Sequence, residues 1–297
     1  MITVLGATGN VGSKLVHQLL ARGQPIRAIA RHSGGLHSLI AGKGEFRAGD
    51  ISNTEFLTQA LTGSEAAFVM IPPDYAAHSL LDHYRKMSKS IASAVRRAGV
   101  PKVVSLSSLG AEHPSGTGPI KGLHEHEQIL NTLDADVLHL RATYFMENLL
   151  MNVPLIQSQA IMGSAIRGDM PIPMIATRDI AKTAADRLVV QDFKGKTVHY
   201  LLGQRDLTLR EAARIVSRIL AVEIPYVEFD VISARRGLIQ MGLSPDAAEQ
   251  FLEMADAFNQ GLITGKGLRN PSNTTPTSFE EFAEIFKLAL AGVGSAA

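Results

Sequence analysis

Three glycines, each three residues after the last, stand between the first apolar strand of the chain and its first amphipathic helix. They are Gly6, Gly9 and Gly12, which follow a β-branched segment at residues 3–5 and precede apolar positions at helical spacing in residues 11–20. In this context the first glycine permits a tight turn, the second lets backbone approach a pyrophosphate, and the third lets helix and strand pack closely. Free N–H groups at the start of the helix then face the phosphates. The run therefore predicts a dinucleotide-binding loop, with a purely structural turn as the alternative.

Short apolar strands and longer helical patterns alternate through the first half of the chain. Since helices separate successive strands, neighbouring strands are expected to be parallel, because parallel strands need crossover connections. The expected fold is α/β, with a Rossmann-type, doubly wound parallel sheet covered by helices on both faces. Strands are expected at residues 3–5, 26–30, 45–48, 66–71, 102–107 and 137–140, and helices near residues 11–20, 36–40, 53–61 and 77–98.

The pattern loosens after residue 148, which suggests a second unit. We expect a dinucleotide-binding domain at residues 1–150, with later contributions from a helix and a strand within residues 177–202. Residues 151–297 are expected to form a smaller, mainly helical substrate lobe, with two or three helices between residues 233 and 261. A last helix is expected at residues 279–290, after a loop rich in Asn, Pro, Ser and Thr. The Ala- and Gly-rich tail from residue 289 is expected to fray.

The amino-acid composition argues against several classes of function. The 297 residues carry 29 Lys and Arg against 28 Asp and Glu, so there is no excess charge to attract nucleic acid or a membrane surface. Without cysteine, disulfides, thiolate nucleophiles and Cys-ligated zinc are excluded. No apolar run reaches the roughly 18–20 residues that cross a bilayer, and no signal peptide is visible. A cytoplasmic protein that acts on a small molecule is expected, with its oligomeric state open.

The end of the second expected strand bears on the choice of cofactor. An acidic residue there would accept hydrogen bonds from a free ribose 2′-hydroxyl, whereas this chain has Arg31, followed by His32 and Ser33. A guanidinium fork suits a 2′-phosphate. NADP(H) is therefore the preferred cofactor and NAD(H) a possible one, with an ordinary solvated arginine as the alternative.

Two later stretches carry a resemblance to a known family. Residues 140–148 read Leu-Arg-Ala-Thr-Tyr-Phe-Met-Glu-Asn, and residues 178–181 read Arg-Asp-Ile-Ala. With the glycine loop, they resemble the atypical short-chain dehydrogenase/reductases and, within them, the NmrA-like family, over residues 1 to about 220. The resemblance implies an NAD(P)H-dependent reductase of quinones or triphenylmethane dyes; other relatives are dinucleotide-sensing regulators. Asp179, in the second stretch, is expected to cap a helix.

The resemblance also assigns residues to the cofactor, strand end by strand end. Asp50 and Ile51 would lie beside the adenine, although Asp50 is as well suited to capping the next turn. The residues after the fourth, fifth and sixth strands would surround the ribose and nicotinamide, at the edge where such sheets bind ligands. The complete expected set is Gly6, Ala7, Thr8, Gly9, Asn10, Val11, Gly12, Arg31, Asp50, Ile51, Ile71, Pro72, Pro73, Ser105, Leu106, Ser107, Tyr144 and Phe145.

The catalytic pair of the wider superfamily is missing. Its members use Tyr-x-x-x-Lys, in which the Lys lowers the pKa of the Tyr. None of the five tyrosines here is followed by Lys four positions later, and residues 118–127 contain no Tyr at all. This departure disfavours alcohol dehydrogenation and sugar epimerisation, because both need a base beside the reacting hydroxyl.

Three groups are candidates to replace the missing pair, namely Lys121, His124 and Ser107. His124 is the preferred catalytic residue, because imidazole titrates near neutral pH and can donate to a developing oxyanion. The alternative is an ordinary, partly buried histidine at a helix start. No metal is expected, because His124 and His126 point to different sides of a helix.

An acceptor that holds an electron pair by delocalisation needs little acid help, so positioning can supply most of the rate. We therefore expect a reductase that transfers hydride from NADPH to a quinone, dye, enone or imine. The rival interpretation is a protein that binds NADP(H) without catalysis and senses its redox state.

Overall fold

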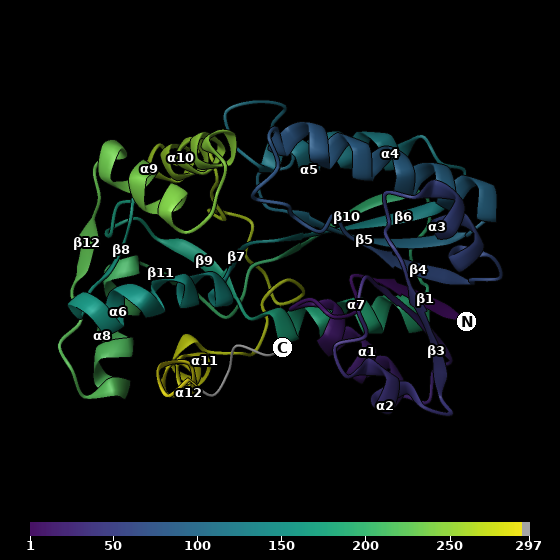
Figure 1. The fold of residues 1–297 in the computed structure, drawn as a ribbon, viewed down its shortest axis with the longest axis horizontal. Coiled ribbons are helices and arrows are strands. Elements are labelled where there is room, and N and C mark those ends of the chain that lie inside the picture. The colour runs from purple at the N-terminus through teal and green to yellow at the C-terminus, as the bar shows by residue number, and fades with distance from the viewer. Residues whose placement is uncertain (293–297) are drawn as a thin grey trace.

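The computed structural model describes residues 1–292, and the remainder of the expected fraying tail lies outside them. Seven parallel strands form the central sheet, in the order β10-β6-β5-β4-β1-β2-β3 (Figure 1). The strand order reverses direction between β1 and β4, which makes the sheet doubly wound, as expected. The strands are β1 (Ile2–Leu5), β2 (Ile26–Ala30), β3 (Gly44–Ala48), β4 (Ala66–Val69), β5 (Lys102–Ser108), β6 (Asp136–Ala142) and β10 (Lys196–Leu201).

Helices cover both faces of this sheet, and a separate apolar core lies under each layer. One core packs α1 and α7 against the sheet, with Leu15, Leu19 and Leu188 fully buried. The other packs α3, α4 and α5, with Leu57, Ile91 and Leu130 fully buried. The helices are α1 (Gly12–Ala21), α2 (Leu36–Ile40), α3 (Thr54–Leu61), α4 (Leu80–Ala98), α5 (Ile120–Asn131) and α7 (Thr177–Val190).

Local capping sets where the helices begin and end. Asn53 accepts a hydrogen bond from the Phe56 N–H and starts α3, in agreement with the helix expected near residues 53–61. Helix α4 begins at Leu80, three residues later than expected, because Ser79 is its cap. It ends at Gly99, whose positive φ of 67° suits glycine.

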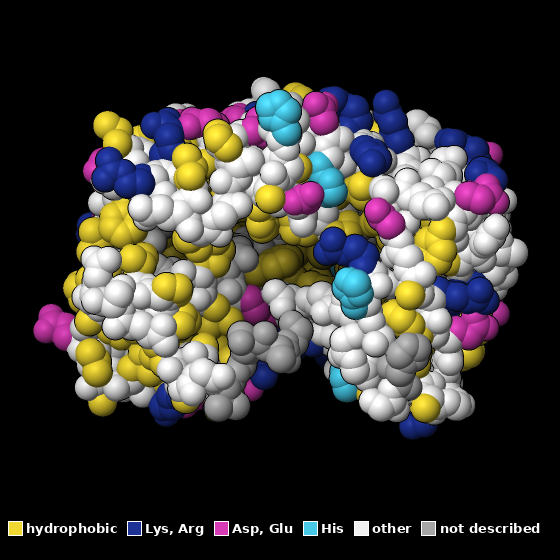
Figure 2. Space-filling model, viewed as in Figure 1, with side chains coloured by type: hydrophobic (Ala, Val, Ile, Leu, Met, Phe, Trp, Pro, Cys, Tyr) yellow, Lys and Arg dark blue, Asp and Glu magenta, His cyan; other side chains and the backbone are white. Residues whose placement is uncertain are grey.

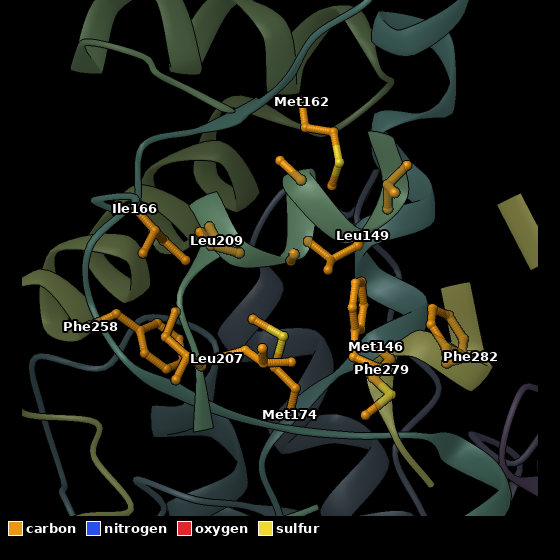
Figure 3. Packing of buried hydrophobic residues seen from close by; sticks show 14 of the residues in the cluster. Met146, Leu149, Met162, Ile166, Met174, Leu207, Leu209, Phe258, Phe279 and Phe282 are labelled. Carbon is orange, nitrogen blue, oxygen red and sulfur yellow. The ribbon is translucent and has the colours of Figure 1, made fainter. Parts of the chain in front are cut away.

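The remaining segments build a second lobe with its own core (Figures 1 and 3). Figure 3 shows Met146 and Leu149 of η1 with Met174 of β9, Phe258 of α10 and Phe279 of α11 in this core. Its helical segments are η1 (Met146–Asn152), α6 (Val153–Gln159), α8 (Leu209–Leu220), α9 (Val231–Gln240), α10 (Pro245–Asn259), α11 (Phe279–Ala283) and α12 (Ile285–Leu290). The expected last helix is thus divided, since the Lys287 N–H bonds to the Glu284 carbonyl in a tighter turn.

The lobe also contains two small sheets that the sequence did not predict. One has the order β11-β9-β7, and the other pairs β12 with β8. Their strands are too short for a periodic pattern, and their partners are distant in sequence. They are β7 (Tyr144–Phe145), β8 (Met162–Ser164), β9 (Ile172–Ile175), β11 (Asp206–Leu207) and β12 (Tyr226–Glu228). The boundary near residue 150 stays a prediction.

The two family-specific stretches hold these parts together. The Glu147 carboxylate accepts hydrogen bonds from the N–H of Thr177 (3.1 Å) and from its Oγ1 (2.5 Å), at the first turn of α7. Asp179 is not the cap of that helix, which corrects the expectation, because α7 begins two residues earlier. Its carboxylate instead accepts from the N–H and Oγ1 of Thr277, at 3.1 and 2.8 Å. Both carboxylates therefore tie α7 to segments remote in sequence.

Candidate active-site cleft

A cleft of about 1230 Å³ runs from the carboxyl edge of the sheet to the second lobe. Figure 2 shows it as a hollow with a hydrophobic floor between the two parts of the molecule. It exceeds the roughly 300–1,000 Å³ of a typical small-molecule pocket, so it has room for a dinucleotide and a second small molecule. All of the expected cofactor residues line it except Ala7 and Ser105, both of which are completely buried.

The glycine loop has the geometry that its sequence predicts. Gly6 has a φ of +66°, and its carbonyl accepts a hydrogen bond from the Gly9 N–H at 2.9 Å. A Cβ on Gly12 would lie 2.0 Å from the Gly6 carbonyl oxygen, so only glycine permits this contact. A Cβ on Gly9 would meet only the Gly6 oxygen, at 3.3 Å, and would otherwise enter the cleft. Gly12 thus serves folding, whereas Gly9 keeps the cleft open.

Free hydrogen-bond donors lie at the start of α1. Within the described residues, the backbone N–H groups of Asn10, Val11 and Gly12 make no hydrogen bond, and all three residues line the cleft. The dipole of the helix adds partial positive charge at this point. This row of unpaired donors fits the pyrophosphate of a dinucleotide.

Arg31 and Asp50 face the same end of the cleft from the neighbouring strand ends. Arg31 is exposed and makes no hydrogen bond or ion pair with any described residue. Asp50 accepts a hydrogen bond from the Ser52 N–H at 2.8 Å, which lowers the pKa of its carboxyl, and the Arg31 charge adds to this effect. Asp50 therefore caps the turn, one of the two roles left open by the sequence, while it also lines the cleft.

A buried ion pair supports the sheet edge where β5 and β6 end. Arg141 donates from Nε and Nη2 to the two carboxylate oxygens of Glu127, at 3.0 and 2.7 Å. The Ser107 hydroxyl donates to the same carboxylate at 2.5 Å. Arg141 also donates from Nη1 to Glu112 and to the Tyr200 hydroxyl, each at 2.9 Å. The hydroxyl proton of Ser107 is thus held by Glu127, which leaves the Ser107 oxygen facing the cleft as an acceptor.

The sequence reasoning missed this network. Glu127 is the last residue of the segment 118–127, which lacks the tyrosine of the superfamily's catalytic pair. Arg141 lies in the stretch that carries the family resemblance. A charged residue within an otherwise apolar helix or strand is almost never buried unless it is paired. The opposite charges of Glu127 and Arg141 could therefore have indicated a buried ion pair.

His124 does not line the cleft. Its Nδ1 lies 2.8 Å from the Ala111 carbonyl oxygen, so the ring holds the loop after β5. Lys121 is also outside the lining, since its Nζ pairs with Glu253 of α10 at 2.5 Å. Of the three candidates for a proton donor, only Ser107 faces the cleft, and its proton is already engaged. The catalytic role expected for His124 gains no support from this geometry.

Besides Tyr75, two phenols line the cleft, Tyr84 on α4 and Tyr144 on β7. Neither hydroxyl makes a hydrogen bond with any described residue, and neither is sealed from the cleft. Burial raises the pKa of both, so they stay protonated as donors. The Tyr84 ring occupies the space left by Gly122 of α5, where a Cβ would lie 2.4 Å from it.

The face of α5 toward the cleft carries no group that exchanges a proton. It presents Pro119, Ile120 and Leu123, and the wall beyond it is lined by Met254, Phe258 and other apolar side chains. Among residues 1–292, no cluster of three or more His, Asp or Glu side chains is arranged to hold a metal. No helix in the same range is both long and apolar enough to cross a membrane.

The whole chain resembles proteins of one known family. The sequence model described as the NmrA-like family matches residues 1–283. An NAD(P)H azoreductase of Xenophilus azovorans is 25% identical to this chain over 296 residues, which cover 100% of each protein.

Two solved structures share the fold. An NADPH-dependent quinone oxidoreductase of Escherichia coli, solved with NADPH, superposes with a TM-score of 0.80 at 23% identity, over 95% of this chain and 98% of its own. NmrA, a negative transcriptional regulator solved with NADP, superposes with a TM-score of 0.72 at 17% identity, over 99% of this chain and 97% of its own. Proteins of this architecture thus include enzymes and regulators.

Proposed function

The chain belongs to the NmrA-like family, and we propose that it is an NADPH-dependent reductase of small conjugated acceptors such as quinones, dyes, enones or imines. The proposal rests on the difference in polarity between the two ends of the cleft. Unpaired N–H groups at Asn10–Gly12 suit a pyrophosphate at one end, and an apolar wall suits a flat aromatic molecule at the other. The similarity to an azoreductase and to a quinone oxidoreductase supports it.

The roles of the binding residues follow from their position along the cleft. The helix start binds the phosphates, Arg31 binds the 2′-phosphate of NADPH in preference to NADH, and Asp50 and Ile51 flank the adenine. Leu106, Ser107, Tyr144 and Phe145 surround the nicotinamide, and Ile71, Pro72 and Pro73 form the wall beside the ribose. Bound NADPH supplies a hydride to the acceptor.

Positioning, rather than proton transfer by a catalytic pair, accounts for the rate in this proposal. The apolar faces of α5 and α10 exclude water and hold the acceptor against the nicotinamide. The neutral hydroxyls of Tyr84 and Tyr144 donate hydrogen bonds to oxygen or nitrogen atoms on which negative charge develops. The final proton comes from solvent.

The test is NADPH oxidation measured against a panel of quinones, azo and triphenylmethane dyes, enones and imines. We expect turnover with at least one member, lost in Gly9→Val. Silence across the panel would contradict a reductase and favour the second candidate, a redox sensor, which the likeness to a transcriptional regulator supports. A sensor requires a partner protein that binds the NADP⁺ and NADPH forms differently, and the partner must shift cofactor affinity by the same factor.

A further inference from the structure

One charged side chain of the second lobe lines the cleft. From Thr143 to Ile263, the cleft-lining residues include no Asp, Glu, Lys or His, and the single charged side chain is Arg236 on α9. The other lining groups of the lobe are apolar or neutral, among them Met151, Phe229 and Phe251. The first domain adds Asp74, beside Tyr75, whose ring contacts Phe251. A charge beside low-dielectric walls acts on a ligand more strongly than the same charge on an open surface.

Arg236 is also unpaired. Its side chain makes no hydrogen bond or ion pair with any described residue, whereas its neighbour Arg235 donates from Nε and Nη2 to the two carboxylate oxygens of Glu249 on α10. Successive residues of a helix point about 100° apart, which directs Arg235 toward α10 and Arg236 toward the cleft. Arg235 therefore joins α9 to α10, whereas no partner in the described residues accounts for Arg236.

The arginines whose side chains make no hydrogen bond or ion pair in residues 1–292 are Arg31, Arg214, Arg218 and Arg236. Of these, Arg31 and Arg236 line the cleft, from opposite parts of the molecule. An unpaired guanidinium presents a planar fork of donors that matches a carboxylate, sulfonate or phosphate. The cofactor offers its phosphates to the glycine loop and Arg31, which leaves Arg236 without an anion from that source.

We propose that Arg236 binds an anionic group on the second ligand, so that the preferred acceptor is an aromatic molecule bearing a carboxylate or sulfonate. The apolar wall takes the ring system and Arg236 takes the charge. A cationic aromatic acceptor is disfavoured by the same residue. This inference rests on the proposed function only in naming that ligand as the hydride acceptor.

Binding of two matched fluorescent probes tests it without turnover. The probes are 8-anilinonaphthalene-1-sulfonate and N-phenyl-1-naphthylamine, which share their rings and differ in the sulfonate. They are titrated into the full-length protein saturated with NADP⁺. We expect the sulfonate to bind more tightly, and Arg236→Gln to reduce that preference about tenfold, the order of a charge-assisted hydrogen bond from an exposed side chain. Arg236→Glu should reverse the preference.

Arg235→Gln is the matched control, because it removes a positive charge one residue away without facing the cleft, and it should leave the preference unchanged. Equal binding of both probes to the unmodified protein, or an equal shift of both probes in Arg236→Gln, would overturn the proposal. So would an equal loss of preference in Arg235→Gln. A roughly tenfold loss of NADPH affinity in Arg236→Gln would assign the residue to a cofactor phosphate and overturn it as well.

A turnover arm separates this inference from the proposed function. The ratio of kcat/KM for 1,4-naphthoquinone-2-sulfonate to that for 1,4-naphthoquinone should fall about tenfold in Arg236→Gln, through KM. If neither quinone nor any other acceptor is reduced, the reductase proposal fails, while the probe titration still decides whether Arg236 binds an anion.

Discussion

The two ends of the cleft are built in different ways. At the phosphate end, one continuous stretch from Gly6 to Gly12 supplies the turn, the close approach and the free N–H donors, all of them backbone features. At the lobe end, side chains from β7, η1, α6, α9 and α10 meet, and the ion pair of Glu127 with Arg141 supports the adjoining sheet edge. A backbone site is specified locally, whereas a side-chain site depends on the whole fold.

Removing Glu127 should have the largest effect, since it leaves the Arg141 charge buried without its bidentate partner. Glu127→Leu is expected to lower the free energy of unfolding by about 3–5 kcal/mol, measured by urea denaturation. Glu112→Gln is the control, because Glu112 binds the same arginine from a side chain that is 36% exposed, against 3% for Glu127. Its loss should cost about 1 kcal/mol or less. Equal losses would contradict the dependence of this sheet edge on the buried pair.

Gly9→Val should weaken cofactor binding at the phosphate end of the cleft without destabilising the fold. Its branched side chain would enter the cleft, so the affinity for NADPH should fall at least about a hundredfold, measured by fluorescence titration. The Tm should change little, because the new Cβ meets only one backbone oxygen. Gly12→Val is the contrasting variant: its Cβ would lie 2.0 Å from the Gly6 oxygen, so the fold itself should be destabilised. Tight NADPH binding by Gly9→Val would remove the phosphate site from the glycine loop.

Arg31→Glu tests the one side chain on which the phosphate end is proposed to depend. It replaces a donor fork by a repelling charge, so NADPH should bind about ten- to thirtyfold more weakly while NADH is much less affected. Arg214→Glu, at another unpaired arginine outside the cleft, should change neither affinity. Equal affinities for NADPH and NADH in the unmodified protein would contradict the proposed preference.

Acid should weaken the packing of α5 against α4 through His126, whose Nδ1 lies 3.0 Å from the Ser88 hydroxyl. Burial lowers the pKa of His126 to about 3 from its ordinary value of 6.5, so the unfolded chain binds more protons between these values. Stability is therefore complete above pH 6.5 and falls as the pH drops toward 3, by about 2 kcal/mol at pH 5. Urea denaturation at pH 7.5 and pH 5 checks this. His126→Asn should lose that part of the pH dependence, and an unchanged dependence would refute the assignment.

His124→Ala should have the smallest effect. The ring holds the Ala111 carbonyl outside the cleft, so kcat should stay within about threefold and the free energy of unfolding should fall by about 1 kcal/mol. His17→Ala, at an exposed residue of α1, controls for the loss of an imidazole. A ten- to hundredfold drop in kcat would instead restore His124 as the proton donor expected from the sequence.

The fold was predictable where the chain repeats a strand and a helix of ordinary length. The six strands expected in the first half all form, and β10 adds to the sheet beside β6. The alternation of short strand patterns with helical patterns made them recognisable. The small sheets of the lobe were not predictable, since pairs such as Tyr144 with Met174 depend on contacts remote in sequence. The same holds for Asp179, whose partner Thr277 lies at the far end of the chain.

By itself, the sequence determined the doubly wound sheet and the glycine loop, since turns, close approaches and free N–H groups are set by neighbouring residues. Which polar side chains reach the cleft depends on the folded arrangement of distant segments. That arrangement put His124 on a backbone carbonyl, engaged Ser107 with Glu127, and left Arg236 unpaired beside an apolar wall. The physical reason is that a side chain's hydrogen-bonding state depends on partners brought close by folding, and these partners have no fixed spacing along the chain.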